Sequence, residues 1–325
     1  MTISAKIIAD SITVEGKRIT TFELEYPRFI LAELNTHRLL SRNSSSSRAI
    51  TVKKNIETII NDTAMPSHWG KNQPGMSAKE ECDNLIYVDS ECQLTRENWW
   101  FNARDAAIDY AQGFEKSGYH KQIVNRLLEP FSHMKTVVTG TELENFFWLR
   151  DHEDAQPEIH ILASRMKQAM DNSIPTQLGV GDWHVPYYFD GCWREHIVYE
   201  APIVSDETFD RNGFTLKEAI AISASQCAQV SYRKTDDSLE KAEKIYERLV
   251  HSFPPHFSPM EHQATPMKVK YDESGLPIVS WDVGITHMDR YNNMWSGNFK
   301  GWIQNRQLMM NDLKLKSMTS VPFED

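Results

Sequence analysis

The chain has 325 residues, enough to bury a core in one large domain or in two ordinary ones. Its 45 acidic residues outnumber its 35 basic ones, and the net charge of -10 argues against broad binding to nucleic acid, which needs many Lys and Arg side chains. No apolar run approaches the about 18 residues of a membrane helix, so we expect no membrane span.

The N-terminal residues and the cysteines predict the compartment. Lys6 and Asp10 leave no long apolar stretch near the N-terminus, so we expect no signal peptide. The four cysteines lack CxxC or zinc-type spacing, which is typical of a reducing compartment. The group His184, Cys192 and His196 also matches no zinc pattern. We therefore expect a cytoplasmic protein with no metal site.

The first predicted elements are a strand, a helix and a loop. Residues 19–26 alternate in a way that predicts a strand ending at Pro27. Residues 28–40 are expected to be helical, with Ile30 and Leu34 one turn apart. The polar run 41–48 is then predicted to be a loop that leaves this helix.

A series of helices is predicted next. Thr95 is a candidate cap for a helix over 95–117, which ends at Gly118 and carries an apolar stripe. The stripe is Trp99, Ala103, Ala106, Tyr110 and Phe114. Further helical segments are predicted at 120–128, 141–149 and 155–170.

The remaining elements complete an α+β prediction. Residues 175–213 are expected to be loops with short strands. A capping box from Thr215 to Glu218 predicts a helix toward Val230, and another helix is expected from Ser238. Residues 267–271 and 277–283 suggest a hairpin. We expect a single catalytic domain, 1–325, with helices packed on an antiparallel or mixed sheet.

Residues 36–48 are unusually rich in hydrogen-bond donors. They hold one imidazole, three guanidinium groups, one amide and six hydroxyls, without a single acid. Guanidinium forks and hydroxyls suit phosphate oxygens, so this run predicts a site for an anionic ligand. The alternative is a solvated serine-rich loop in which Arg38 and Arg42 interact with a helix C-terminus.

This run resembles the signature of the flavin-dependent thymidylate synthases, the ThyX family. The family signature reads Arg-His-Arg, two residues, Ser, one residue, Asn-Glu, one residue, Ser-Gly-Arg-Tyr. The residues in register here are His37, Arg38, Ser41, Asn43, Ser46 and Arg48. A second segment, from Phe146 to Ile159, is similar to the family's "F-L-x-L-R … A-Q-x-E-I" helix pair, and 125–130 is similar to its "A-R-x-x-L-P" segment.

The other family segments occur out of order. Ala228-Gln229-Val230-Ser231-Tyr232 resembles "A-R-V-S-Y", and Ser258-Pro259-Met260-Glu261-His262 resembles "S-P-F-E-H". In the family both precede the signature, whereas here they follow it. Residues 20–170 thus resemble the family's C-terminal part and 219–266 its N-terminal part. We therefore predict a ThyX-like fold with circularly permuted connectivity, which closely spaced termini make possible.

The resemblance implies an activity and its cofactors. It implies a homotetrameric methyltransferase that converts dUMP to dTMP, with FAD as hydride donor, NADPH as reductant of the flavin and methylenetetrahydrofolate as one-carbon donor. The flavin carries the redox chemistry and the protein supplies binding and charge.

The resemblance also implies roles for individual residues. The FAD contacts are expected to be His37, Arg38, Asn145, Ser231, Ser258 and Glu261. The nucleotide phosphate is expected to bind Ser44, Ser45, Ser46, Ser47 and Arg48, and the pocket is completed by Arg126 and Arg150. Arg150 is the expected catalytic residue, because a guanidinium beside the pyrimidine stabilises negative charge that develops on the ring.

Three departures from the family signature keep other functions open. Thr36 replaces the first Arg, Glu33 a Gln, and Ser44 a Glu. A carboxylate at position 33 can accept from an exocyclic amine, so methylation of dCMP is one alternative. A flavin- or nucleotide-binding protein without turnover is another. The segment 298–307, with Arg306, is a hypothetical source of replacement donors.

Ordinary structural roles compete with several of these predictions. Arg150 and Glu158 are alternatively surface ion-pair partners, and Ser231, Ser258 and Glu261 are alternatively helix-capping residues. Five aromatic residues are expected to lie in the core. They are Trp99, Trp100, Phe146, Phe147 and Trp148.

Overall fold

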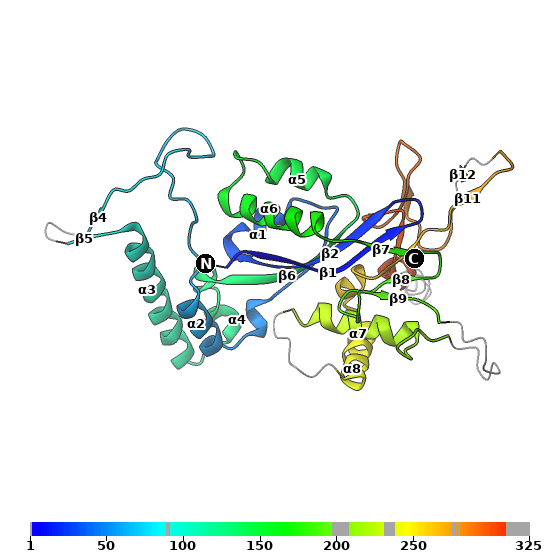
Figure 1. Cartoon of the computed structure of the whole chain (residues 1–325). Helices are drawn as coiled ribbons and strands as arrows, with labels where there is room; N and C mark the ends of the chain where they lie inside the picture. The colour runs from blue at the N-terminus through cyan, green and yellow to red at the C-terminus, as the bar shows by residue number, and fades with distance from the viewer. Residues whose placement is uncertain are drawn as a thin grey trace, which may run out of the picture.

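A computed structural model of the chain describes residues 2–88, 92–196, 208–230, 238–274, 277–278 and 280–309. It contains helices and several sheets, which confirms the predicted α+β class (Figure 1). The prediction made for Ser231 lies outside the described residues. Among the described helices, none has the length and apolar character that crossing a bilayer requires.

The main sheet has five strands in the order β3-β6-β2-β1-β7. The strands are β1 (Ser4–Thr13), β2 (Arg18–Pro27), β3 (Ser41–Ser44), β6 (His133–Gly140) and β7 (Thr176–Leu178). β7 runs parallel to β1 and the other neighbours are antiparallel, so the sheet is mixed, as predicted. The predicted strand 19–26 is β2, and it ends at Pro27 as expected.

Alternate residues of each strand face opposite layers, because the side-chain period of a strand is two. On one face, Phe22 and Val138 pack against Ile159 and Leu162 of α6 (Pro157–Asp171). On the other face, Val137 packs against the C-terminal end of α7 (Leu216–Ala228). Figure 1 shows α5 and α6 on one side of the long strands and α7 on the other.

Three helices, α2, α3 and α4, pack together at one end of the molecule (Figure 1). The other labelled α-helices are α1 (Leu31–Asn35), α2 (Val52–Asn61), α3 (Arg96–Lys116), α4 (Lys121–Val124), α5 (Glu144–Arg150) and α8 (Leu239–His251), and residues 305–309 are helical as well. The 3-10 helices are Arg28–Ile30, Ser47–Ala49, Glu129–Phe131 and Ser258–Glu261.

A second sheet, ordered β16-β10-β8-β9, lies at the other end of the molecule (Figure 1). Its strands are β8 (Trp183–His184), β9 (Cys192–Trp193), β10 (Ala264–Pro266) and β16 (Trp302–Gln304). The small sheets contain β4 (Ile86–Tyr87), β5 (Gln93–Leu94), β11 (Lys270–Tyr271), β12 (Pro277–Ile278), β13 (His287–Met288), β14 (Met294–Ser296) and β15 (Phe299–Lys300). β11 pairs with β12, which confirms the predicted hairpin.

Local sequence signals placed several helices correctly. Thr95 caps α3, and its hydroxyl accepts from the backbone N–H of Asn98. The predicted capping box is formed, with reciprocal bonds between Thr215 and Glu218 at the start of α7. These ends are predictable because capping depends on residues three positions apart.

The prediction for residues 28–48 was partly wrong. The helix ends at Asn35, and 36–40 form turns in which the Thr36 hydroxyl donates to the Glu33 carbonyl at 2.7 Å. Arg42 then donates to the carbonyl oxygens of Leu34 and His37, which also accept from the backbone N–H groups of His37 and Leu40. Residues 41–44 are not loop but strand β3, because β6 supplies backbone partners for a serine-rich segment of low strand propensity.

The predicted core aromatics were only partly correct. Phe146 is buried, but Trp99 and Trp148 are 42% and 76% exposed. The apolar stripe predicted for α3 is largely exposed, because this helix packs through Ile108 and Ala111 instead. The choice between two apolar faces of one helix depends on where its neighbours lie, and the sequence of α3 does not contain that information.

Candidate functional site

Arg150, at the end of α5, meets the first residues of the signature run. Its Nε donates to Nε2 of His37 at 2.9 Å, and its Nη2 donates to Oγ1 of Thr36 at 3.2 Å. Burial, reinforced by the charges of Arg150 and Arg42, lowers the pKa of His37 from 6.5 to about 4. His37 is therefore neutral at pH 7, with its proton on Nδ1, because Nε2 accepts from Arg150.

Arg150 and Glu158 do not form the surface ion pair considered as an alternative. Glu158 is buried and instead accepts hydrogen bonds from the backbone and hydroxyl of Ser67. The guanidinium of Arg150 is thus held by two uncharged groups. Two of its five N–H donors make these bonds, and the others can serve a ligand.

Arg38 and Glu261, both predicted to contact FAD, line one hollow of about 280 Å³. Arg42 and Arg306 line it as well, together with Leu40, Gly297, Asn298, Gln304 and Gln307. Arg306 forms an ion pair with Glu261. Its Nε is buried and, within the described chain, has no hydrogen-bond partner. Three guanidinium groups and one carboxylate give this hollow a positive charge.

The serine run is held against β6 by its backbone and side chains. Ser45 pairs with Lys135 through its N–H, which donates to the Lys135 carbonyl at 2.7 Å, and the Ser44 hydroxyl accepts from Thr136. The Ser46 hydroxyl caps the following 3-10 helix by accepting from the N–H of Arg48. Ser47 is buried and donates to Glu129. The run is therefore an ordered segment rather than a solvated loop.

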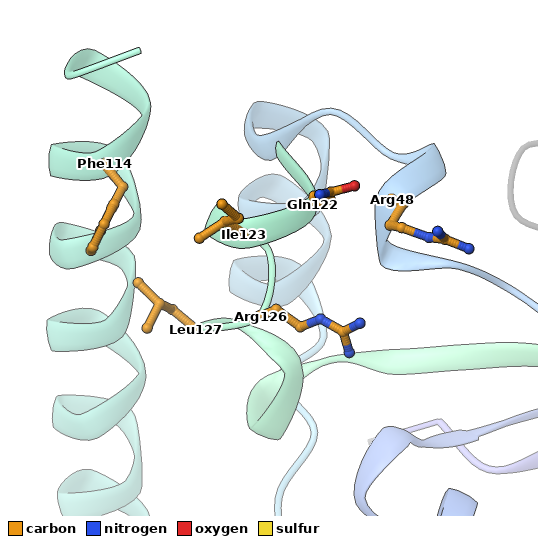
Figure 2. A pocket seen from close by; sticks show the side chains of 6 residues that line it. All are labelled: Arg48, Phe114, Gln122, Ile123, Arg126 and Leu127. Carbon is orange, nitrogen blue, oxygen red and sulfur yellow. The ribbon is translucent and has the colours of Figure 1, made fainter. Parts of the chain in front are cut away.

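Arg48 and Arg126, both predicted to bind the nucleotide, line a second hollow of about 490 Å³. Its other walls are Phe114 of α3, Gln122 and Ile123 of α4, and Leu127. Figure 2 shows the two guanidinium groups pointing to the same side, away from Phe114. The hollow therefore has an apolar end and a cationic end, a combination that suits an anion with a flat apolar group.

The remaining predicted residues occupy different positions. Asn145 is exposed in the first turn of α5. Ser258 is exposed at the start of its 3-10 helix, beside the side chain of Asn43. The structure thus brings together His37 with Arg150, Arg38 with Glu261, and Arg48 with Arg126.

Sequence reasoning did not select several polar residues buried near Asn43. Thr21 and Thr139 are fully buried on adjacent strands, and His184 and His262 are fully buried in the layer above them. Because β2 and β6 also contain other polar residues, among them Glu23 and Thr136, the strand sequences carry no signal for the two threonines. Their pairing with the two imidazoles depends on the tertiary structure.

The comparisons with known proteins agree with the signature over one part of the chain. Residues 17–176 match the family model described as "Thymidylate synthase complementing protein". No curated protein matches the sequence. A solved structure of the UMP/dUMP methylase PolB from Streptomyces cacaoi bound with 5-Br dUMP aligns at 15% identity and a TM-score of 0.39, over 52% of this chain and 90% of that one. The same methylase bound with 5-Br UMP aligns at 17% identity and a TM-score of 0.40, over 52% of this chain and 88% of that one.

The matched segment runs from the start of β2 to the first residue of β7. It contains the signature run, α5 and α6, and so includes both His37 and Arg150. Residues 17–176, just under half of the chain, therefore match the model of the thymidylate synthase complementing protein family, and the sequence motifs that resemble the flavin-dependent thymidylate synthases lie partly within this match.

Proposed function

We propose that the chain is a flavin-dependent thymidylate synthase that methylates dUMP to dTMP. The observation that carries this proposal is the contact of Arg150 with His37 and Thr36. It joins two family segments that lie 113 residues apart, counted from His37 to Arg150, and places a guanidinium at the signature run. The family match of residues 17–176 supports the same reaction class.

The hollow lined by Arg38, Arg42, Arg306 and Glu261 is the proposed site of FAD. Guanidinium groups suit a pyrophosphate, and the buried Nε of Arg306 offers a donor that no described group accepts. The Glu261 carboxylate can accept from a ribose hydroxyl. The charges fit the phosphate and ribose part of the cofactor. When bound, FAD supplies the hydride, and NADPH is the proposed source of its electrons.

The hollow lined by Arg48 and Arg126 is the proposed site of the nucleotide. The two guanidinium groups at its cationic end would hold the phosphate, together with the hydroxyls of the serine run. Its apolar end offers Phe114 and Leu127 as packing surface for the base. Methylenetetrahydrofolate is the proposed one-carbon donor.

Arg150 is the proposed catalytic residue. Its guanidinium would stabilise the negative charge that develops on the pyrimidine when C5 becomes nucleophilic. His37 holds Nε of Arg150, and being neutral it adds no competing positive charge. The ring of His37 packs edge-on against Phe146 at 4.9 Å between centroids, which fixes the acceptor that Arg150 uses.

Three wider features belong to the same proposal. The two permuted segments belong to one catalytic domain, 1–325, and the contact of Ser258 with Asn43 supports this, because it joins the segment 219–266 to the signature run. We also infer a homotetramer and a cytoplasmic location, which the family resemblance and the cysteine pattern support.

Methylation of dCMP is a second candidate, and one observation favours it. Oε2 of Glu33 is buried and has no hydrogen-bond partner among the described residues. A buried carboxylate oxygen without a donor is costly, and the exocyclic amine of cytosine is a donor that uracil lacks. Glu33 lies in the same turn as Thr36, which contacts Arg150.

The decisive experiment measures release of tritium from C5-labelled dUMP and dCMP. The purified protein is assayed with FAD, NADPH and methylenetetrahydrofolate, and flavin binding is followed by absorbance. The proposal expects a bound flavin and release from dUMP. Arg150→Ala should lower release by about tenfold to a hundredfold, whereas Arg165→Ala, which changes an exposed arginine of α6, should preserve it.

The other outcomes of this experiment distinguish the alternative functions. Release from dCMP alone would replace the thymidylate synthase by the second candidate. Flavin binding without release from either nucleotide would indicate a binding protein without turnover. Protein that binds no flavin would contradict both enzyme functions.

A further inference from the structure

A line of polar side chains crosses one face of the main sheet, strand by strand. The four side chains on the sheet come from the adjacent strands β1, β2, β6 and β3 and share the face toward α7. Two imidazoles from the covering layer bridge them. In order, the six residues are Ser11, His184, Thr21, Thr139, His262 and Asn43.

Hydrogen bonds connect the six residues without a gap. His184 bridges β1 and β2, because its Nδ1 lies 2.8 Å from Oγ of Ser11 and its Nε2 lies 2.8 Å from Oγ1 of Thr21. The hydroxyls of Thr21 and Thr139 are 2.7 Å apart. His262 bridges β6 and β3, with Nδ1 2.8 Å from Thr139 and Nε2 3.3 Å from the Asn43 amide.

All six residues except Asn43 are buried. Burial keeps both imidazoles neutral and so determines how many hydrogens are available for hydrogen bonds along the line. Burial lowers the pKa of both His184 and His262 from 6.5 to about 3, so each ring is neutral and carries one N–H. Each of the three hydroxyls carries one hydrogen as well. These five groups supply one hydrogen each, and the Asn43 amide supplies another when its nitrogen faces His262, so six groups can donate across five contacts.

Each neutral ring has one N–H for its two contacts, and neither threonine hydroxyl has a further hydrogen-bond partner among the described residues, so the donors must all point the same way. Either Ser11 donates to His184 and the series continues outward to Asn43, or Asn43 donates to His262 and the series runs inward to Ser11. In the outward series both imidazoles carry their proton on Nε2. In the inward series both carry it on Nδ1.

The surroundings of Asn43 select the inward series. One atom of its amide lies 2.9 Å from the carbonyl oxygen of Ser258, 3.1 Å from that of Arg42 and 3.3 Å from Nε2 of His262. Two backbone carbonyls can only accept, so that atom is the amide nitrogen. The same NH2 group faces Nε2 of His262, and an N–H on Nε2 would point at this donor, so the ring carries its proton on Nδ1.

We propose that Asn43 and His262 form a positioning relay in which the orientation of the Asn43 amide determines the tautomer of His184, which lies on the same face of the sheet, over β1 and β2. In the inward series, His262 Nδ1–H donates to Thr139, whose hydroxyl donates to Thr21. Thr21 then donates to Nε2 of His184, which carries its proton on Nδ1 and donates to Ser11.

The relay connects two segments of the chain through Asn43. Asn43 links β3, which leads into the serine run, to the 3-10 helix that carries Ser258 and Glu261. A ligand group that reverses the Asn43 amide would reverse every donor in the line. The relay itself is independent of the reaction proposed above, since it follows from hydrogen positions alone.

The test is 15N NMR of imidazole-labelled, full-length protein at pH 7. In the wild type we expect both His184 and His262 to carry the proton on Nδ1. A wild type in which either ring carries its proton on Nε2 would overturn the proposal, whatever the variants do.

Two variants test the transmission. Asn43→Asp replaces the donor by an acceptor, so both rings should move their proton to Nε2. Adding Thr139→Val to Asn43→Asp removes the hydroxyl between them, so His262 should change while His184 keeps its proton on Nδ1. A purely structural role would not move the tautomer of His184. If His262 changes in Asn43→Asp while His184 does not, the proposal is wrong.

Discussion

Nε of Arg150 donates to Nε2 of His37 at 2.9 Å, which fixes the end of α5 against the turn before β3. Neither residue meets the other through local sequence, because the contact spans 113 positions. The neutral imidazole accepts without adding charge, so the guanidinium keeps its full charge for a ligand. This contact is the basis of the first two predictions.

Arg150→Ala should lower tritium release from dUMP by about tenfold to a hundredfold. A hydrogen bond from a charged group contributes about 1.5–3 kcal/mol, and each 1.36 kcal/mol in the barrier is about tenfold in rate. The measurement is kcat with saturating nucleotide, and Arg165→Ala on α6 is the matched control. Equal rates for the two variants would show that Arg150 has no part in the reaction.

Thr36→Val should lower the rate by a smaller factor, about twofold to tenfold. The change removes the oxygen that accepts from Nη2 of Arg150 at 3.2 Å, a bond worth about 0.5–1.5 kcal/mol. Thr36→Ser keeps the hydroxyl and should retain most of the activity. A Ser variant as slow as the Val variant would indicate that the methyl group, not the hydroxyl, matters.

We expect the two cationic hollows to bind different ligands, FAD in one and dUMP in the other. Arg306→Ala should weaken FAD binding about tenfold and leave dUMP affinity within twofold, because Arg306 lines the hollow with Arg38 and Glu261. Arg126→Ala should do the reverse, because it lines the hollow with Arg48. Flavin titration and equilibrium dialysis of dUMP measure the two affinities. Loss of dUMP binding in Arg306→Ala with unchanged flavin binding would exchange the two assignments.

His184 should make folding stability depend on pH. Its pKa is about 3 in the folded state against an ordinary value of 6.5, so the unfolded chain binds this proton first as pH falls. The stability it contributes is present above pH 6.5 and is lost between that pH and about 3. We expect the free energy of unfolding, measured by chemical denaturation at pH 7, 6 and 5, to rise less steeply with pH in His184→Gln than in the wild type. The difference in slope should be up to about 1.4 kcal/mol per pH unit. If the free energy of unfolding has the same pH dependence in the variant and the wild type, the prediction is wrong.

Elements with local signals were predictable from the sequence. The Thr95 cap, the capping box from Thr215 to Glu218 and the end of β2 at Pro27 depend on residues within one turn or one strand. The family signature was equally local, since its residues lie in one ungapped run. The match of residues 17–176 confirms the family there, while permuted connectivity stays a prediction.

Elements whose structure depends on tertiary contacts with distant segments were not predictable from the sequence. Residues 41–44 form a strand because β6 accepts their backbone, and α3 buries Ile108 and Ala111 rather than its predicted stripe because α2 and α4 lie on that side. In both cases the segment itself allows two structures of similar free energy, and tertiary contacts choose between them.

The sequence by itself determined the resemblance to the family over residues 17–176, the α+β class, and which side chains are available to bind an anion. Only the tertiary structure decided which of them meet. It joined Arg150 to His37, separated Arg306 from Arg126 into two hollows, and aligned Thr21 with Thr139 under two buried imidazoles. The reason is physical: a donor's partner is set by position in space and by burial, and both follow from strand order and layer packing rather than from neighbouring residues.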